Sequence, residues 1–280
     1  MAVMEIHLYS EALKMDTDIH IIYPNEHDSS MRKTLWLLHG SSGDSSVWMR
    51  NTTVEQIAER YNVVVIMPDG IYSCFTDMYR GNCFATYVTA ELPRVVRGFF
   101  PKLSGDRADN FVAGYSNGGY GAMLLGLTDP YIYGAVGAFS GGNKVNVAYP
   151  KDGSKRAHDM YINFGDPVAG SRYDTENLAR IAAASGKPLP RVYHARGELE
   201  GGFDNNPLSD LLMSFEGNPF GYIRNTHPGY GHVWPLWEAE LQIFLGEFLK
   251  LPEYEKIASP PQTDFFTPWN TPARYSNMSI

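Results

Sequence analysis

The stretch Gly114-Tyr115-Ser116-Asn117-Gly118-Gly119 decides the fold class of this chain. It follows the apolar run 111–113 and precedes the helix-like segment 120–127. A glycine-flanked serine between a strand and a helix is typical of a nucleophile elbow, in which the serine occupies a sharp, strained turn. The flanking glycines are needed because a side chain at either place would collide with the neighbouring strand or helix. The bare motif also occurs in ordinary turns, but in this context it predicts a nucleophile at Ser116.

Short apolar runs alternate with helix-like segments along most of the chain. Strands are expected at 5–9, 18–23, 34–38, 63–67, 111–113, 135–139, 160–164, 191–195 and 222–225, and helices at 54–61, 85–100, 120–127, 173–184, 208–215 and 234–249. Pro93 should kink the second helix or begin a new one. This alternation predicts an α/β fold with a mostly parallel central sheet and helices on both faces. The two leading strands lack a helix between them, which predicts an antiparallel edge at the N-terminus.

Composition excludes several classes of partner. Apolar residues make up 44% of the 280 residues, the net charge is −8, and no lysine/arginine run occurs, so nucleic acid and anionic membranes are not expected partners. No apolar stretch approaches the ~18 residues of a membrane span, and residues 1–10 lack the pattern of a signal peptide. The two cysteines, Cys74 and Cys83, fit neither a zinc site nor a redox pair. We therefore expect a cytoplasmic protein without a metal or a cofactor.

No repeat, low-complexity tract or linker divides the chain, so residues 1–251 are predicted to form a single domain. Residues 252–280 are rich in proline and carry isolated aromatic residues without helical or strand periodicity. We expect an extended C-terminal tail that lies over the domain or over a neighbouring subunit of a homo-oligomer, with disorder as the alternative.

A serine hydroxyl needs an imidazole to take its proton and an acid to orient that imidazole. After an elbow serine, the expected chain order is acid and then histidine. His227 and His232 both lie in the loop after the last predicted strand. His232 is favoured because Gly231 permits a tight loop and the following helix holds its far end; His227 is the weaker alternative. His39 and His194 are expected to be structural.

In parallel α/β sheets, catalytic groups gather at the carboxyl ends of the strands. The acid is therefore expected directly after the strand at 191–195. Glu198 is too close to the strand end, and Asp210 falls in a predicted helix. Glu200 and Asp204 remain, and position alone does not separate them; Glu200 is favoured.

Two backbone amides are expected to bind an oxyanion. The amide of Asn117 lies at the start of the helix after the elbow. The second should come from the loop Leu37-Leu38-His39-Gly40-Ser41-Ser42-Gly43, where Gly40 lets the backbone approach a substrate and the amide of Ser41 can point inward.

Three motifs together resemble the putative-esterase family of α/β-hydrolases: Leu37-Leu38-His39-Gly40, the elbow, and Gly231-His232-Val233-Trp234-Pro235-Leu236-Trp237. This family includes tributyrin, feruloyl and acetylxylan esterases, S-formylglutathione hydrolase and mycolyltransferases, and the G-H-x-W-x-x-W form is most similar to the tributyrin branch. The resemblance spans residues 4 to 251. The acid segment departs from the family pattern, because Gly197-Glu198-Leu199-Glu200 places glutamate where that branch has aspartate. This register supports Glu200 over Asp204.

The resemblance implies a serine carboxylesterase that hydrolyses short-chain acyl esters, acetyl or similar, including those on sugars, through an acyl-enzyme. Ser116, Glu200 and His232 would be the catalytic residues, and a small-molecule ester the substrate. The alternatives are a feruloyl or acetylxylan-type esterase, an acyltransferase, and a non-catalytic carbohydrate-binding relative.

Overall fold

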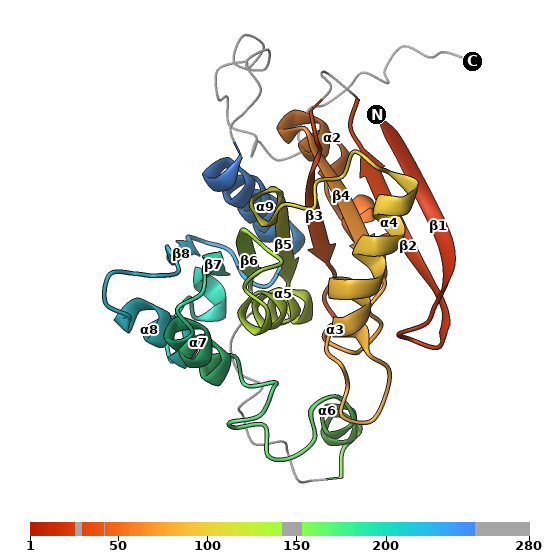
Figure 1. The fold of residues 1–280 in the computed structure, drawn as a ribbon. Coiled ribbons are helices and arrows are strands. Elements are labelled where there is room, and N and C mark those ends of the chain that lie inside the picture. Colours follow the sequence, from red (N-terminus) through yellow and green to blue (C-terminus); the bar gives the residue numbers. More distant parts are fainter. Residues whose placement is uncertain (26–29, 42, 142–152, 250–280) are drawn as a thin grey trace, which may run out of the picture.

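An eight-stranded sheet runs through the molecule in the order β1-β2-β4-β3-β5-β6-β7-β8. The computed structural model describes residues 1–25, 30–41, 43–141 and 153–249 (Figure 1). The strands are β1 Ala2–Ser10, β2 Met15–Tyr23, β3 Lys33–Leu38, β4 Val63–Pro68, β5 Asn110–Tyr115, β6 Ala135–Phe139, β7 Arg191–Gly197 and β8 Ile223–His227. β1 pairs antiparallel with β2, β2 pairs antiparallel with β4, and the remaining pairs are parallel. The predicted parallel sheet with an antiparallel N-terminal edge is confirmed.

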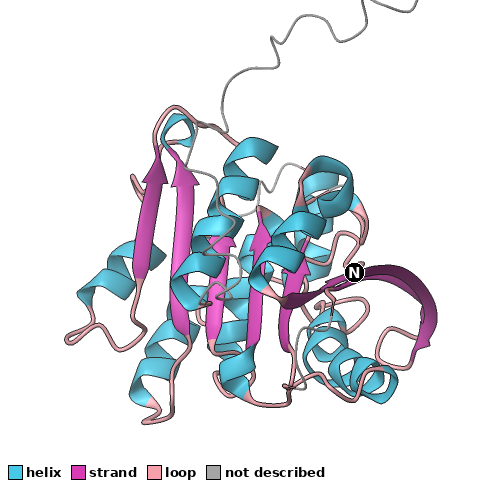
Figure 2. Cartoon of the chain, turned by 90° about the horizontal axis from the view of Figure 1, so that it is seen from above, coloured by secondary structure: helices cyan, strands magenta, loops and turns pink. Residues whose placement is uncertain are grey.

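Helices cover both faces of the sheet (Figure 2). They are α1 Val47–Asn51, α2 Val54–Tyr61, α3 Phe84–Thr86, α4 Leu92–Phe99, α5 Asn117–Thr128, α6 Lys155–Phe164, α7 Thr175–Ala184, α8 Pro207–Ser214 and α9 Trp234–Phe248. Buried side chains of α3, α4, α5, α7 and α8 form one core with the sheet, while those of α1, α2 and α9 form a second core on the opposite face. Among the described helices, none has the length and apolar character that crossing a bilayer requires.

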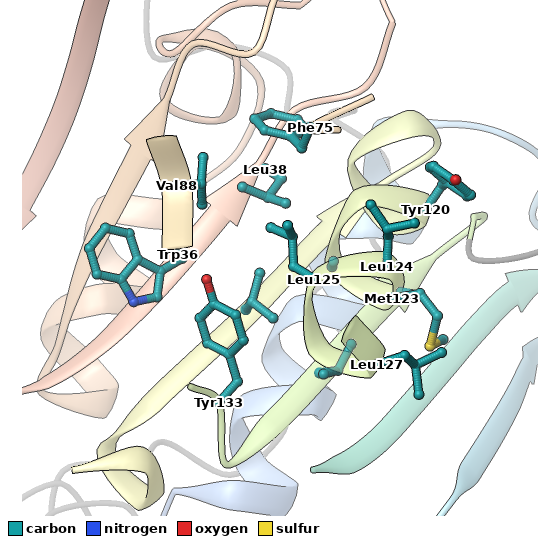
Figure 3. Packing of buried hydrophobic residues seen from close by; sticks show 14 of the residues in the cluster. Trp36, Leu38, Phe75, Val88, Tyr120, Met123, Leu124, Leu125, Leu127 and Tyr133 are labelled. Carbon is teal, nitrogen blue, oxygen red and sulfur yellow. The ribbon is translucent and has the colours of Figure 1, made fainter. Parts of the chain in front are cut away.

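The central strands are buried at nearly every position, which explains their unbroken apolar sequence. β4, β5 and β6 are buried at each residue, because helices lie against both of their faces. β1, at the sheet edge, instead alternates between exposed and partly buried residues. On one face, Trp36 and Leu38 of β3 pack near Leu124 and Leu125 of α5 (Figure 3). The run of apolar residues therefore distinguishes central strands from the edge strand.

Two segments differ from the sequence prediction. Residues 160–164 were expected to form a strand, but they end the helix α6, so this prediction is wrong. The side chain of Ser154 accepts a hydrogen bond from the amide of Ala157 and begins that helix. Met160 and Phe164 are four residues apart and share one helical face, a spacing that a five-residue apolar run conceals. The helix expected at 85–100 is divided by a π-helical turn, Tyr87–Glu91, after which α4 begins with Pro93 in its first turn.

The register of the parallel strands determines where the functional residues gather. The last paired residues are Leu38 with Gly114, Tyr115 with Phe139, Phe139 with Ala195, and Gly197 with His227. The strands from β3 to β8 therefore end at one edge of the sheet, and the loops that follow them lie side by side. The segment 252–280, predicted to be a tail, lies outside the described residues, and a single domain ending at residue 251 stays a prediction.

Candidate active site

Ser116 occupies a strained turn between β5 and α5. Its backbone has φ 54° and ψ −118°, a conformation that costs a residue with a Cβ atom roughly 1–3 kcal/mol. Two hydrogen bonds hold the turn: the Ser116 amide donates to the Phe139 carbonyl at 2.8 Å, and the Tyr120 amide donates to the Ser116 carbonyl at 3.0 Å. The side chain is partly exposed at the edge where the strands end. This is the geometry expected of a nucleophile elbow.

The two flanking glycines permit the turn because the backbone passes too close for a side chain. A Cβ atom on Gly114 would lie 2.6 Å from the carbonyl of Gly118. A Cβ atom on Gly118 would lie 2.4 Å from the carbonyl oxygen of His39 and 2.5 Å from that of Leu38. Both contacts are with backbone atoms, which cannot swing aside, so the strand, the elbow and the helix depend on glycine at both positions.

Glu200 lies in a short 3₁₀ turn, Glu198–Glu200, directly after β7. Its Oε2 is 2.9 Å from Nδ1 of His232, and its Oε1 accepts hydrogen bonds from the Gly197 amide at 2.7 Å and from the Ser140 hydroxyl at 2.6 Å. Gly201 then reverses the chain with φ 84°. Burial raises the pKa of Glu200, but the hydrogen bonds from His232, Ser140 and Gly197 together outweigh burial and bring that pKa down to about 2. The carboxylate is therefore ionised at neutral pH.

His232 lies in the loop between β8 and α9, with 47% of its side chain exposed. Because Nδ1 faces the Glu200 carboxylate, a neutral ring carries its proton there and leaves Nε2 as the proton acceptor. The edge of the ring packs on Trp237 at a centroid distance of 5.0 Å and an interplanar angle of 84°. Trp237 in turn stacks on Tyr115, the residue before Ser116, at 4.1 Å. One aromatic column thus connects the loop of His232 with the elbow.

The alternatives considered for the acid and the base lie elsewhere. Asp204 is exposed, and it is Glu200 that contacts His232. His227 pairs with a different carboxylate, since its Nδ1 is 2.8 Å from Oε1 of Glu240. Glu240 is completely buried in α9 and also accepts hydrogen bonds from Tyr193 and Asn225. The structure therefore brings Glu200 and His232 together and holds His227 in a separate polar cluster.

His39, expected to be structural, ties the loop after β3 to the loop after β4. It is 2% exposed, its Nδ1 donates to the Gly40 carbonyl at 2.7 Å, and its Nε2 accepts from the Gly70 amide at 2.8 Å. Gly40 packs against the ring of Tyr115, which a Cβ atom at that position would meet at 2.4 Å. Ser41 follows as an exposed residue of the same loop, and Asn117 is the first residue of α5. Both proposed oxyanion donors therefore lie at the edge that carries Ser116.

His194 is also structural, as expected, and its burial should make the stability of the fold depend on pH. The side chain is completely buried and its Nε2 donates to the Gly141 carbonyl at 2.6 Å. Burial lowers the pKa of His194 to about 4 from the usual 6.5. Between those two pH values the unfolded chain takes up a proton that the folded chain does not, so acidification favours unfolding by on the order of 3 kcal/mol.

We expect His194→Gln, whose amide can still donate to Gly141, to remove this part of the pH dependence. The measurement is urea unfolding of both proteins at pH 7 and pH 4.5. An equal loss of unfolding free energy in wild type and variant would contradict the assignment to His194.

One group of described residues has a spacing suited to a metal ion: Glu5, His7 and Asp18. These side chains lie on the exposed β1–β2 hairpin, several strands away from β5. Nδ1 of His7 already contacts Asp18 at 2.5 Å. This group is remote from Ser116 and takes no part in the candidate active site.

Ser140, whose hydroxyl contacts Glu200, belongs to none of the motifs in the sequence. The available signal was its place directly after β6, at the carboxyl end of a parallel strand. Trp48 lies near the oxyanion loop in sequence, but it is 1% exposed and packs between Tyr115 and Trp234, so its role is in the core.

Known proteins share this architecture. An acetyl esterase of Caldicellulosiruptor saccharolyticus is 29% identical over 261 residues, covering 85% of this chain and 94% of the relative. The solved structure of FphF, a fluorophosphonate-binding serine hydrolase of Staphylococcus aureus, is 26% identical with a TM-score of 0.77 and covers 88% of this chain and 98% of FphF. The apoenzyme structure of the S-formylglutathione hydrolase FrmB from the same organism is also 26% identical, with a TM-score of 0.75 and the same coverage.

The model of the family described as "Putative esterase" matches residues 10–242, which include the elbow, Glu200 and His232. The resemblance drawn from the three motifs is confirmed at the level of the family, while the tributyrin branch stays a prediction. The chain belongs to this esterase family and is a serine carboxylic ester hydrolase.

Proposed function

We propose that this carboxylesterase hydrolyses short-chain acyl esters, acetyl or similar, through an acyl-enzyme formed on Ser116. The observation that carries the proposal is the 2.9 Å contact between His232 Nδ1 and Glu200 Oε2 at the edge of the sheet where Ser116 occupies a strained turn. An imidazole that a carboxylate orients can take the proton of an elbow serine, and this activates the serine hydroxyl as a nucleophile.

In the proposed reaction, Ser116 Oγ attacks the ester carbonyl while His232 Nε2 takes the hydroxyl proton. Glu200 stabilises the imidazolium, and the amides of Asn117 and Ser41 stabilise the tetrahedral oxyanion. His232 then donates its proton to the leaving alcohol. Water attacks the acyl-enzyme and gives a proton to Nε2. His232 then passes that proton to Ser116 Oγ as the acyl–Oγ bond breaks, which releases the carboxylic acid and restores the serine hydroxyl.

Support for a short acyl group comes from the acetyl esterase, which matches this chain over nearly its whole length. Exposed apolar side chains lie in the loops at the same edge of the sheet: Ile71 and Tyr72 after β4, Leu199 after β7 and Val233 beside His232. They offer apolar surface for the acyl chain or the alcohol. Thioesters are the second candidate substrate class, favoured by the likeness to FrmB.

The test is a series of p-nitrophenyl esters from acetate through butyrate to octanoate, with methyl ferulate, acetylated xylo-oligosaccharides and an S-acyl thioester as further substrates. We expect kcat/KM to be highest for acetate or butyrate and about 10-fold or more lower for octanoate. Each methylene that the site does not accommodate weakens binding of the transition state by about 1–3 kcal/mol. Preference for octanoate or for ferulate would contradict the short-chain proposal. Added methanol separates hydrolysis from acyl transfer, because a transferase would form the methyl ester in preference to the acid.

A further inference from the structure

Ser140 lies between the elbow and the acid, at the end of β6. Its amide donates to the Ala195 carbonyl of β7 at 2.8 Å, and the neighbouring Phe139 carbonyl accepts the amide of Ser116. Its side chain faces Glu200, with Oγ 2.6 Å from Oε1. The residue is 8% exposed. Ser140 is therefore fixed by the same strand ends that hold Ser116 and Glu200.

The direction of the Ser140 hydroxyl is determined by Trp237. The indole Nε1 of Trp237 is 3.0 Å from Ser140 Oγ. An indole N–H can only donate, so the serine oxygen must accept this bond and point its own proton at the carboxylate. Glu200 Oε1 receives that proton together with the Gly197 amide, and Oε2 is left facing His232.

The backbone of Ser140 is itself unfavourable for a residue with a Cβ atom. Its φ is 52°, in the left-handed region where glycine is the usual occupant. Strain of this kind persists where the surrounding structure requires it, and it gathers at functional sites. The conformation places the hydroxyl, which glycine lacks, between the indole and the carboxylate.

We propose that Ser140 is a positioning residue for Glu200, and that Trp237 acts through it. The inference rests on the proposed role of Glu200 as the acid that orients His232. Glutamate has one more rotatable bond than aspartate, so its carboxylate needs more anchoring to meet the imidazole in one orientation. The Ser140 hydroxyl, aligned by Trp237, supplies that anchor. The ring of Trp237 also packs against His232, so this side chain contacts the base and steadies the acid.

The test compares kcat and KM for Ser140→Ala and Trp237→Phe with p-nitrophenyl acetate. We expect Ser140→Ala to lower kcat about 10- to 100-fold with KM within twofold of wild type, because misplacement of a catalytic group acts on the transition state. Trp237→Phe keeps an aromatic ring but removes the N–H donor, so its loss should be smaller and in the same direction. The double variant should match Ser140→Ala, because both changes break one chain of hydrogen bonds.

Two variants provide matched controls. Ser185→Ala removes an exposed hydroxyl that donates to the Ala182 carbonyl and accepts from the Lys187 amide at the end of α7, on a segment that does not contact Glu200 or His232 through any of these bonds. Trp36→Phe removes a buried indole N–H that donates to Asn110, in the core on the opposite face of the sheet from Trp237. Neither is expected to change kcat, although Trp36→Phe should lower the melting temperature.

The decisive comparison is Ser140→Ala in a Glu200→Gln background, measured by single-turnover kinetics. If Ser140 acts through the Glu200 carboxylate, the second substitution should add less than a twofold loss. The same 10- to 100-fold loss in both backgrounds, or a Ser140→Ala kcat equal to wild type, would overturn the inference. Failure of the proposed function would look different, because Ser116→Ala would then keep its activity whatever Ser140 does.

Discussion

Replacing Ser116 with alanine is expected to lower kcat for p-nitrophenyl acetate by about 10⁵-fold, to the level that transition-state binding alone can supply. The hydroxyl is the atom that forms the acyl bond in the proposed reaction, so its removal ends covalent catalysis. The fold should survive, because alanine has the same Cβ atom as serine and suffers the same backbone strain at φ 54°.

Two measurements check this prediction. Steady-state hydrolysis gives the loss of kcat, and intact-protein mass spectrometry after treatment with a fluorophosphonate should show one adduct on the wild type and none on Ser116→Ala. Ser185→Ala serves as the control that retains both activity and adduct. Activity of Ser116→Ala equal to that of wild type would exclude Ser116 as the nucleophile.

Glu200→Gln is expected to lower kcat by about 10⁴-fold while the fold is preserved. Glutamine keeps the shape and can still accept hydrogen bonds from Gly197 and Ser140 through its amide oxygen. Its NH₂ group then faces His232 and can only donate, which favours the tautomer with the proton on Nε2. That tautomer cannot accept the proton of Ser116, so the base is lost without a change in packing.

Asp204→Asn is the matched control for this substitution. Asp204 is exposed and four residues from Glu200, so we expect kcat within twofold of wild type. A greater loss from Asp204→Asn than from Glu200→Gln would reassign the orienting acid.

The lowered pKa of Glu200 should also make the stability of the fold depend on pH. Its pKa in the folded protein is about 2, below the usual 4.5, so its stabilising effect is fully present above pH 4.5 and is lost as the pH falls through about 2. That effect is on the order of 3 kcal/mol. Glu200→Gln should flatten the acid side of the stability curve below pH 4.5. Above that pH the carboxylate stays ionised, so an activity change at higher pH has another origin.

Local patterns predicted the parts of the fold that depend on neighbouring residues. The elbow at Ser116 follows from glycines within two residues of it, and buried strands follow from continuous apolar runs such as 34–38. The segment 160–164 was mispredicted because five residues are too few to separate a helical from an extended period. Its helix depends on the cap at Ser154, six residues before the start of that segment.

In the candidate site, too, some features follow from local sequence and others from tertiary contacts. The sequence by itself predicted the fold class, the elbow and the loop of His232, and the resemblance of its motifs favoured Glu200, because each of these predictions depends on residues that are close together along the chain. Only the tertiary structure decided that His227 pairs with Glu240 and that the Ser140 hydroxyl lies between the indole of Trp237 and the carboxylate of Glu200. Ser140 and Trp237 are 97 residues apart in sequence, and they meet because β6 ends beside the start of α9. Contacts of this kind arise from the order and register of strands in the sheet, which no local pattern of residues specifies.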